Sequence, residues 1–264
     1  MESQTPYFSP FLPVFINLIR YFIFAGLAFL LVYKVFNYKF LKNKIQKRIA
    51  KNTDFLREIK NSIFSTVIFG LVGFVLINSS IGEHTKIYRN ISDFSIWWLP
   101  LSGILMLIIQ DTYFYWVHRA IHSPKVFKYI HRVHHQSINP SPWASYSFHF
   151  SEAIIEALIF PIMLFIIPLH PLVIFSFTFV AFLFNVYGHL GFEIVPKWFR
   201  YSWLFEIFNT SVHHNLHHEK FKGNYGLYFR FWDRVMNTEN PNYVKVFDKV
   251  QEQRFGGKTI YLIN

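Results

Sequence analysis

Four long apolar stretches constrain this chain more than any other feature of its sequence. They cover residues 13–33, 62–77, 97–118 and 153–187. A bilayer core of about 30 Å requires roughly 20 apolar residues in a helix, so most of these stretches suit one crossing each. The last is long enough for two crossings, and prolines on both sides of Leu169 and His170 predict a turn within it. We therefore expect an all-α integral membrane protein with four to five transmembrane helices.

The composition argues against several other classes of protein. Hydrophobic residues make up 52% of the 264 residues and aromatic residues 21%, which is too apolar for an ordinary soluble domain. The absence of cysteine excludes disulfides and thiolate zinc sites. The net charge of +11 is compatible with nucleic-acid binding only if the basic residues lie on a polar domain. We expect a membrane partner and no nucleic acid.

The distribution of charge predicts the orientation in the membrane. Residues 34–60 contain nine lysines or arginines and two acidic residues, whereas the charges of residues 81–96 are balanced. The positive-inside rule places the first of these loops in the cytosol, either of a bacterial inner membrane or of the endoplasmic reticulum. Counting the crossings then puts every histidine-rich segment on the cytosolic face. Arg20, the one charge in the first stretch, is expected near its outer end, where it can reach the headgroups.

Nine of the thirteen histidines fall into three short motifs, HRAIH, HRVHH and HHNLHH. Spacings of three and four residues direct side chains to one face of a helix. A buried imidazole needs a hydrogen-bond partner of its own, so three such faces are hard to explain by packing. Nine imidazoles are also too many for one zinc ion, which takes four ligands. The pattern predicts a site for two metal ions, and imidazole alone does not choose between zinc, copper and iron.

Several motifs in order carry a family resemblance over about residues 97–239. QDTYFYWVHRAIH, HRVHH followed by PSPWASYSFH, HHNLHH and NYGLYFRFWDR together resemble the integral-membrane fatty-acid hydroxylase and sterol desaturase superfamily. The resemblance implies a membrane-bound site for two metals, iron in function, that uses O2 on a lipid. A further metal-site histidine of the family matches His189, within NVYGHLGFE. The implied ligands are His118, His122, His131, His134, His135, His189, His214, His217 and His218.

The chain departs from the family pattern at three places. Asn185 stands where the sphingolipid-type hydroxylases have a histidine, which argues against that branch. The run ASYSFH is similar to the sterol C5-desaturases, but Phe150 follows His149 where that branch usually has proline. His213 makes the third motif ambiguous, and we favour His214 as the ligand because it completes the spacing of three and four.

Carboxylates near these motifs are candidate catalytic residues that act through the ligands. Asp111 precedes His118 by seven residues, and Glu152 follows His149 by three. A hydrogen bond from a ligand's free ring N–H would compensate a carboxylate in the membrane and orient the ring. Glu193 follows His189 by four residues and is a further candidate, and ordinary surface is the alternative for both Glu152 and Glu193. His149 is expected to hydrogen-bond a ligand, whereas His84 and His170 are expected to be incidental.

Two further groups of residues have expected roles outside the metal site. Three aromatic residues are expected either to line a lipid pocket or to serve in packing: Trp143, Tyr146 and Phe148. Asp233 and Arg234 are expected to brace the cap.

The function that these patterns predict is a membrane lipid oxygenase. Oxidation of an unactivated C–H bond requires a redox metal with an open position for O2, so two iron ions are expected, although zinc can occupy the site in a purified sample. A membrane metal transporter is the alternative, but its ligands would lie at mid-bilayer. The patterns separate neither hydroxylation from desaturation nor one lipid from another.

The chain offers no cofactor site that could deliver electrons to the metals. It has no cysteine for an iron–sulfur cluster and no dinucleotide-binding fingerprint, so we expect a separate cytochrome or ferredoxin as electron donor. The donor would bind a basic surface formed by five residues: Lys125, Lys128, Arg132, Lys220 and Lys222. The alternative is that these residues face lipid headgroups. We expect residues 1–264 to form one domain, with a helical cytosolic cap that holds the metals.

Overall fold

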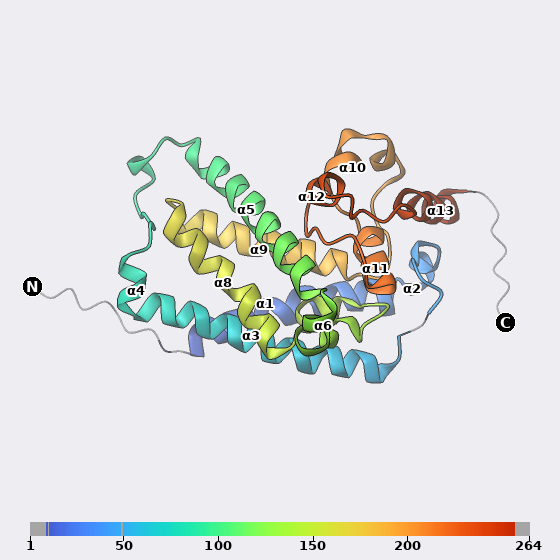
Figure 1. Cartoon of the computed structure of the whole chain (residues 1–264), viewed down its shortest axis with the longest axis horizontal. Helices are drawn as coiled ribbons and strands as arrows, with labels where there is room; N and C mark the ends of the chain where they lie inside the picture. The colour runs from blue at the N-terminus through green and yellow to red at the C-terminus, as the bar shows by residue number, and fades with distance from the viewer. Residues whose placement is uncertain (1–8, 10, 49, 257–264) are drawn as a thin grey trace, which may run out of the picture.

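The computed structural model describes residues 9, 11–48 and 50–256, and within this part of the chain the secondary structure is helical, with isolated β-bridges only. Figure 1 shows a bundle of long helices with a cap of short helices at one end. The long helices are α1 (Phe11–Phe29, continued by a π-helix at Leu30–Val35), α3 (Asn52–Asn78), α5 (Trp98–Ile121), α8 (Phe150–Ile166) and α9 (Pro171–Gly188). The all-α fold predicted from the sequence is confirmed.

The short helices lie between and beyond the long ones. In the connections they are α2 (Asn37–Phe40), α4 (Ser80–Glu83), α6 (Pro124–Ile130) and α7 (Arg132–His135). After α9 the chain forms α10 (Trp203–Ile207), α11 (Ser211–Lys220), α12 (Phe231–Val235) and α13 (Tyr243–Phe255). Single 3₁₀ turns occur at Leu41–Asn43, Ile91–Asp93, Pro142–Tyr146 and Lys197–Tyr201.

Three helices of the described residues are long and apolar enough to cross a membrane by length and composition: Phe11–Val35, α3 and α9. The other two long helices fall short of these criteria; α8, for example, has 17 residues. Both nevertheless pack beside the three, and α5 turns Leu101, Ile104 and Ile108 outward, each about half exposed. An outward apolar face is what a lipid-facing helix requires, so the structure agrees with an integral membrane protein while the count of crossings lies between three and five.

The two ends of the bundle are built from different loops. The hairpin between α8 and α9 turns at residues 167–170 as predicted, and His170 caps α9 by accepting a hydrogen bond from Leu172 N at 3.2 Å. This turn meets residues 79–97, since Tyr88 N donates to Leu169 O at 3.1 Å. The basic loop lies at the other end, where Gln46 Nε2 donates to Asn215 Oδ1 on α11 at 2.8 Å. The basic loop and the histidine-rich cap therefore share one end of the bundle.

Arg20 has hydrogen-bond partners within the bundle. It lies midway along the span Phe11–Val35, where it donates to Thr178 O of α9 at 3.4 Å and to Asn17 Oδ1 at 2.6 Å. An arginine inside the bundle is costly without such partners. Arg20 therefore links α1 to α9.

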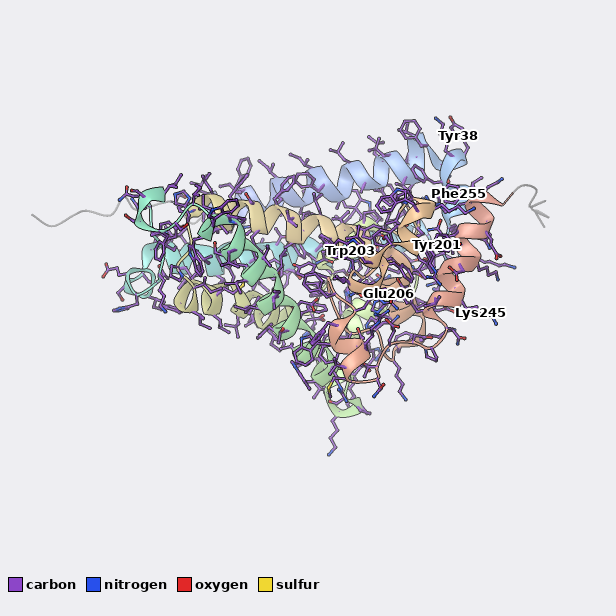
Figure 2. All side chains as sticks on the ribbon, turned by 90° about the horizontal axis from the view of Figure 1, so that it is seen from above. Tyr38, Tyr201, Trp203, Glu206, Lys245 and Phe255 are labelled. Atoms are coloured by element: carbon purple, nitrogen blue, oxygen red, sulfur yellow. The ribbon has the colours of Figure 1, made fainter. Side chains whose placement is uncertain are left out.

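The cap has an apolar core of its own, formed by Phe205, Val212, Tyr243 and Phe247 from α10, α11 and α13. Tyr201 and Trp203 project from it and are 81% and 70% exposed (Figure 2). Arg234 of α12 forms an ion pair with Glu206 of α10, in agreement with its expected bracing role.

Candidate metal centre

All nine histidines that the sequence predicts as ligands gather in two clusters at the junction of bundle and cap. Within each cluster the nearest ligand atoms all lie within 4.8 Å of one another. The five-histidine cluster consists of His118, His122, His131, His135 and His217. The four-histidine cluster consists of His134, His189, His214 and His218.

Two short elements connect the clusters. Helix α7 directs His134 into the four-histidine cluster and its neighbour His135 into the five-histidine cluster. Helix α11 divides His217 and His218 in the same way. Neighbouring residues of a helix point about 100° apart, so one element can serve two adjacent points. The rings of His135 and His218 lie 4.8 Å apart, and the two clusters are therefore in contact.

The five-histidine cluster converges through the Nε2 atoms. Those of His122, His135 and His217 form a triangle with sides of 3.0, 3.1 and 3.1 Å. The Nε2 atoms of His118 and His131 lie 3.1 Å apart. Metal–nitrogen bonds of about 2.1 Å at right angles to one another place two nitrogens roughly 3 Å apart. These separations therefore match ligands of one shared ion.

The four-histidine cluster repeats this geometry. His189 Nε2 lies 3.3 Å from His134 Nε2 and 3.0 Å from His214 Nε2, and His218 Nε2 lies 3.1 Å from His214 Nε2. All four side chains are buried. His189 stands just after α9, whose last turn holds it through Asn185 O.

Main-chain carbonyl groups determine which ring nitrogen carries the proton. The Nδ1 atoms of His118, His189 and His217 lie 2.7 to 2.9 Å from the oxygens of Tyr225, Asn185 and Gly223. A carbonyl oxygen only accepts, so each Nδ1 must donate. Burial lowers the pKa of His217 well below its usual range and that of His189 to about 4, so both rings are neutral. Their Nε2 atoms are then bare lone pairs, the form that binds a metal.

These bare lone pairs point at one another and repel unless a cation lies between them. His118 and His131 illustrate the point, since Nδ1 of each faces an oxygen and the two Nε2 atoms are 3.1 Å apart. A metal ion converts this repulsion into attraction. The donor set therefore fits two ions held mainly by imidazole nitrogen.

Glu152 lies where a carboxylate can orient a ligand. Its Oε1 is 2.6 Å from His131 Nδ1, and both side chains are buried. Such a bond fixes the ring and raises its basicity toward a metal. His149 has a different position from the one expected, because it caps α8 by accepting from Ser151 N rather than touching a cluster.

Asp111 differs from the expectation that it bonds a ring N–H. Its Oδ1 accepts the main-chain N–H groups of Leu227, Tyr228 and Phe229 at 2.7 to 3.1 Å. The hydrogen bonds of the described residues include none between Asp111 and a histidine ring. Asp111 therefore positions the loop at 223–230 rather than a ligand ring.

This loop, which overlaps the NYGLYFRFWDR motif at residues 224–230, supplies groups that the sequence did not reveal. Its Gly223 and Tyr225 carbonyls hold His217 and His118, and Asp233 fixes it by accepting from Tyr225 N and Gly226 N at 2.9 and 2.8 Å. Gly223 adopts a φ of 76°, and a Cβ there would lie 2.5 Å from Thr238 O. Because main-chain carbonyls carry no residue signal, only the glycine pointed to this turn.

Two further predicted residues lie beside the site. Glu193 contacts no ligand ring; it accepts from Tyr187 Oη at 2.7 Å and from Val212 N at the start of α11. His213 belongs to neither cluster and lies 3.8 Å from Asp233, whereas His214 belongs to the four-histidine cluster. Its place in that cluster favours His214 over His213 as the candidate ligand in the third motif.

A largely apolar cavity of about 440 Å³ lies between α1, α3, α5, α8 and α9, and two of its lining residues contact the clusters. Its lining residue Phe114 lies 4.8 Å from the His118 ring, and Phe148 lies 5.0 Å from the His134 ring. Tyr146 also lines it, in line with the predicted pocket role. Trp143 does not, because it packs against Phe29 of α1 instead.

Comparison with known proteins identifies the family. Residues 103–238 match the family model for fatty acid hydroxylase. The chain belongs to the fatty acid hydroxylase family. This membership confirms the expectation of a membrane lipid-modifying oxygenase, and with it an oxidoreductase rather than a transporter.

Similar curated proteins include three sterol enzymes. A Delta(7)-sterol 5(6)-desaturase of Gibberella zeae is 32% identical over 76% of this chain, which spans only 57% of that protein. Lathosterol oxidase of Rattus norvegicus is 32% identical over 82% of this chain and 69% of its own length. Lathosterol oxidase of Homo sapiens is 30% identical over 85% of this chain and 72% of its own length. No solved structure matches the chain.

Proposed function

We propose that this family member holds one iron ion in each histidine cluster and uses O2 to oxidise a C–H bond of a sterol-like lipid. The nine predicted ligands are proposed as the metal-binding residues, with Glu152 orienting His131. The observation that carries the proposal is the apolar cavity, whose lining residues Phe114 and Phe148 each contact a histidine of one cluster. A long apolar substrate in this cavity would have its reacting carbon close to the metals.

The reaction requires electrons that the substrate does not supply. In desaturation, O2 takes two hydrogens from the lipid and two electrons and two protons from a donor, giving one C=C bond and two water molecules. Hydroxylation uses the same two electrons and two protons but gives one hydroxyl group and one water. The names of the curated relatives favour desaturation. When bound, the iron ions would supply the redox chemistry.

The chain's own residues position the reactants. The carbonyls of Gly223 and Tyr225 hold two ring nitrogens toward the ion, so the ligands need little rearrangement when it binds. Phe114 and Phe148 cover the cavity end and exclude water from it. An enclosed apolar site also limits side reactions of a strong oxidant.

We propose that the electron donor binds over the five-histidine cluster from the cytosolic side. The five basic residues named above are exposed there. Beneath them, Phe127 lies 5.4 Å from the His122 ring and Phe221 lies 4.9 Å from the His135 ring. A basic surface would attract an acidic carrier to the side of the site that Phe127 and Phe221 cover.

The function is tested by metal analysis and lipid analysis of the same protein. Purified protein should contain two metal ions per chain, and His135→Ala or His217→Ala should lose metal and activity together. His84→Ala, an exposed histidine far from the clusters, is the matched control. Cells that express the active protein and receive lathosterol should yield a product with two hydrogen atoms fewer than lathosterol. One ion per chain, unaffected by either substitution, would contradict the two-ion site, and a product with an added oxygen would indicate hydroxylation.

A further inference from the structure

The substrate cavity contains one carboxyl group whose partner the protein does not provide. Glu156, on α8, lines the cavity. The hydrogen bonds and ion pairs of residues 9, 11–48 and 50–256 include none to its carboxyl group. A polar group enclosed among apolar side chains is costly unless it is hydrogen-bonded. Its partner must therefore come from whatever fills the cavity.

Glu156 lies at the end of the cavity that is close to the metals. It follows Glu152 by one helical turn, and Glu152 holds His131 of the five-histidine cluster at 2.6 Å. Side chains four residues apart in a helix have Cβ atoms about 5–6 Å from one another. The Glu156 carboxyl group thus faces the part of a lipid that lies a few bonds from the reacting carbon.

Two neutral polar groups share this end of the cavity. Tyr228 donates its hydroxyl to Gln110 Oε1 at 2.5 Å, and both residues line the cavity. The Gln110 amide nitrogen then remains available as a donor. A carboxyl oxygen that accepts and an amide that donates are together complementary to a hydroxyl group, which does both.

We propose that Glu156, with Gln110 beside it, binds a hydroxyl group of the lipid and so selects a lipid alcohol as substrate. This inference rests on the proposed function, because it concerns the same cavity. A cationic lipid would also suit a carboxyl group, but Arg20 lines the same cavity and has no acidic partner among the described residues. Its positive charge disfavours a second cation in so apolar a space.

The test measures binding to metal-free protein, so that it does not depend on turnover. Dissociation constants are determined in lipid nanodiscs for radiolabelled lathosterol and for the same sterol skeleton lacking its hydroxyl group. Wild-type protein should bind the alcohol about tenfold more tightly, as expected for hydrogen bonding in a space without water. Glu156→Leu should bind the two probes equally, and Glu156→Gln should retain part of the preference.

Phe160→Leu is the matched control, since Phe160 lines the same cavity one turn further along α8. This variant should raise the dissociation constants of both probes by the same factor and leave the ratio of the two constants unchanged. A wild-type protein without preference, or a Glu156→Leu variant that keeps it, would overturn the inference while leaving the proposed function intact. Wild-type protein that binds neither probe would refute the sterol-like substrate, and this inference with it.

Discussion

The proton positions on the histidine rings explain how so many imidazoles can be buried together. Each of His118, His189 and His217 gives its Nδ1 hydrogen to a main-chain oxygen. A neutral ring costs far less to bury than a charged one, and burial itself depresses the pKa of His217. The carbonyls therefore select the tautomer, and the cluster that remains is a set of lone pairs awaiting a cation.

Glu152→Gln is expected to lower turnover by about 10- to 100-fold, because this is the usual effect of removing a partner that orients a metal ligand. The amide can still accept from His131, so metal should be largely retained. Turnover and metal content are measured on the same sample, with Asp248→Asn at the partly exposed ion pair to Arg200 as the control. Full activity in the Glu152 variant would show that the bond has no part in the reaction.

Short elements, rather than the long helices, decide how the ligands divide between the clusters. Helix α7 has four residues, of which the last two serve different clusters. The loop at 223–230 adds the carbonyls that orient His118 and His217, both of the five-histidine cluster. The integrity of this loop should thus matter more to one metal than to the other.

We expect Asp233→Asn to reduce the metal content from two ions per chain toward one. The two carboxylate oxygens accept from Tyr225 N and Gly226 N. In asparagine an NH₂ group replaces one of these oxygens, so one main-chain N–H would face another donor and lose its hydrogen bond. Metal analysis after dialysis measures the effect. Asp248→Asn, in the partly exposed pair with Arg200, should keep both ions. Equal loss of both ions would show that the loop does not act on one cluster selectively.

The whole molecule places its chemistry at one end of a membrane bundle. The basic loop packs against the cap through Gln46 and Asn215, whereas the hairpin turn and residues 79–97 meet at the other end. This arrangement agrees with the crossings counted from the sequence, in which the basic loop and the histidines face the same side.

Because the chain has no cysteine, single-cysteine variants can report which side this is. A membrane-impermeant reagent outside sealed right-side-out vesicles should label Glu83→Cys and not Lys249→Cys. Permeabilised vesicles should label both, which controls for reactivity. Labelling of Lys249→Cys in intact vesicles would place the cap outside the cytosol.

Electron delivery is also a property of the whole molecule. Purified protein with lathosterol, O2 and NAD(P)H alone should not sustain turnover, and addition of an acidic carrier with its reductase should restore it. Lys125→Glu with Lys128→Glu should weaken the response to the carrier and flatten its salt dependence. Lys245→Glu, on α13 of the cap (Figure 2), should not. Repeated turnover without any carrier would refute a separate donor.

The sequence by itself determined the features that depend on residue type and short spacing. Apolar length predicted the membrane helices, and the prolines around His170 predicted the hairpin turn. The histidine spacing selected eight of the nine side chains that the structure brings together, and the family resemblance added His189. Helical periodicity makes such local patterns readable. The division into two clusters, the contacts of Asp111 and the carbonyls of Gly223 and Tyr225 were decided by tertiary structure alone. The contacts of Asp111 and Tyr225 join segments more than a hundred residues apart. The Gly223 and Tyr225 contacts are made by main-chain atoms that are the same in every residue, so residue type does not encode them.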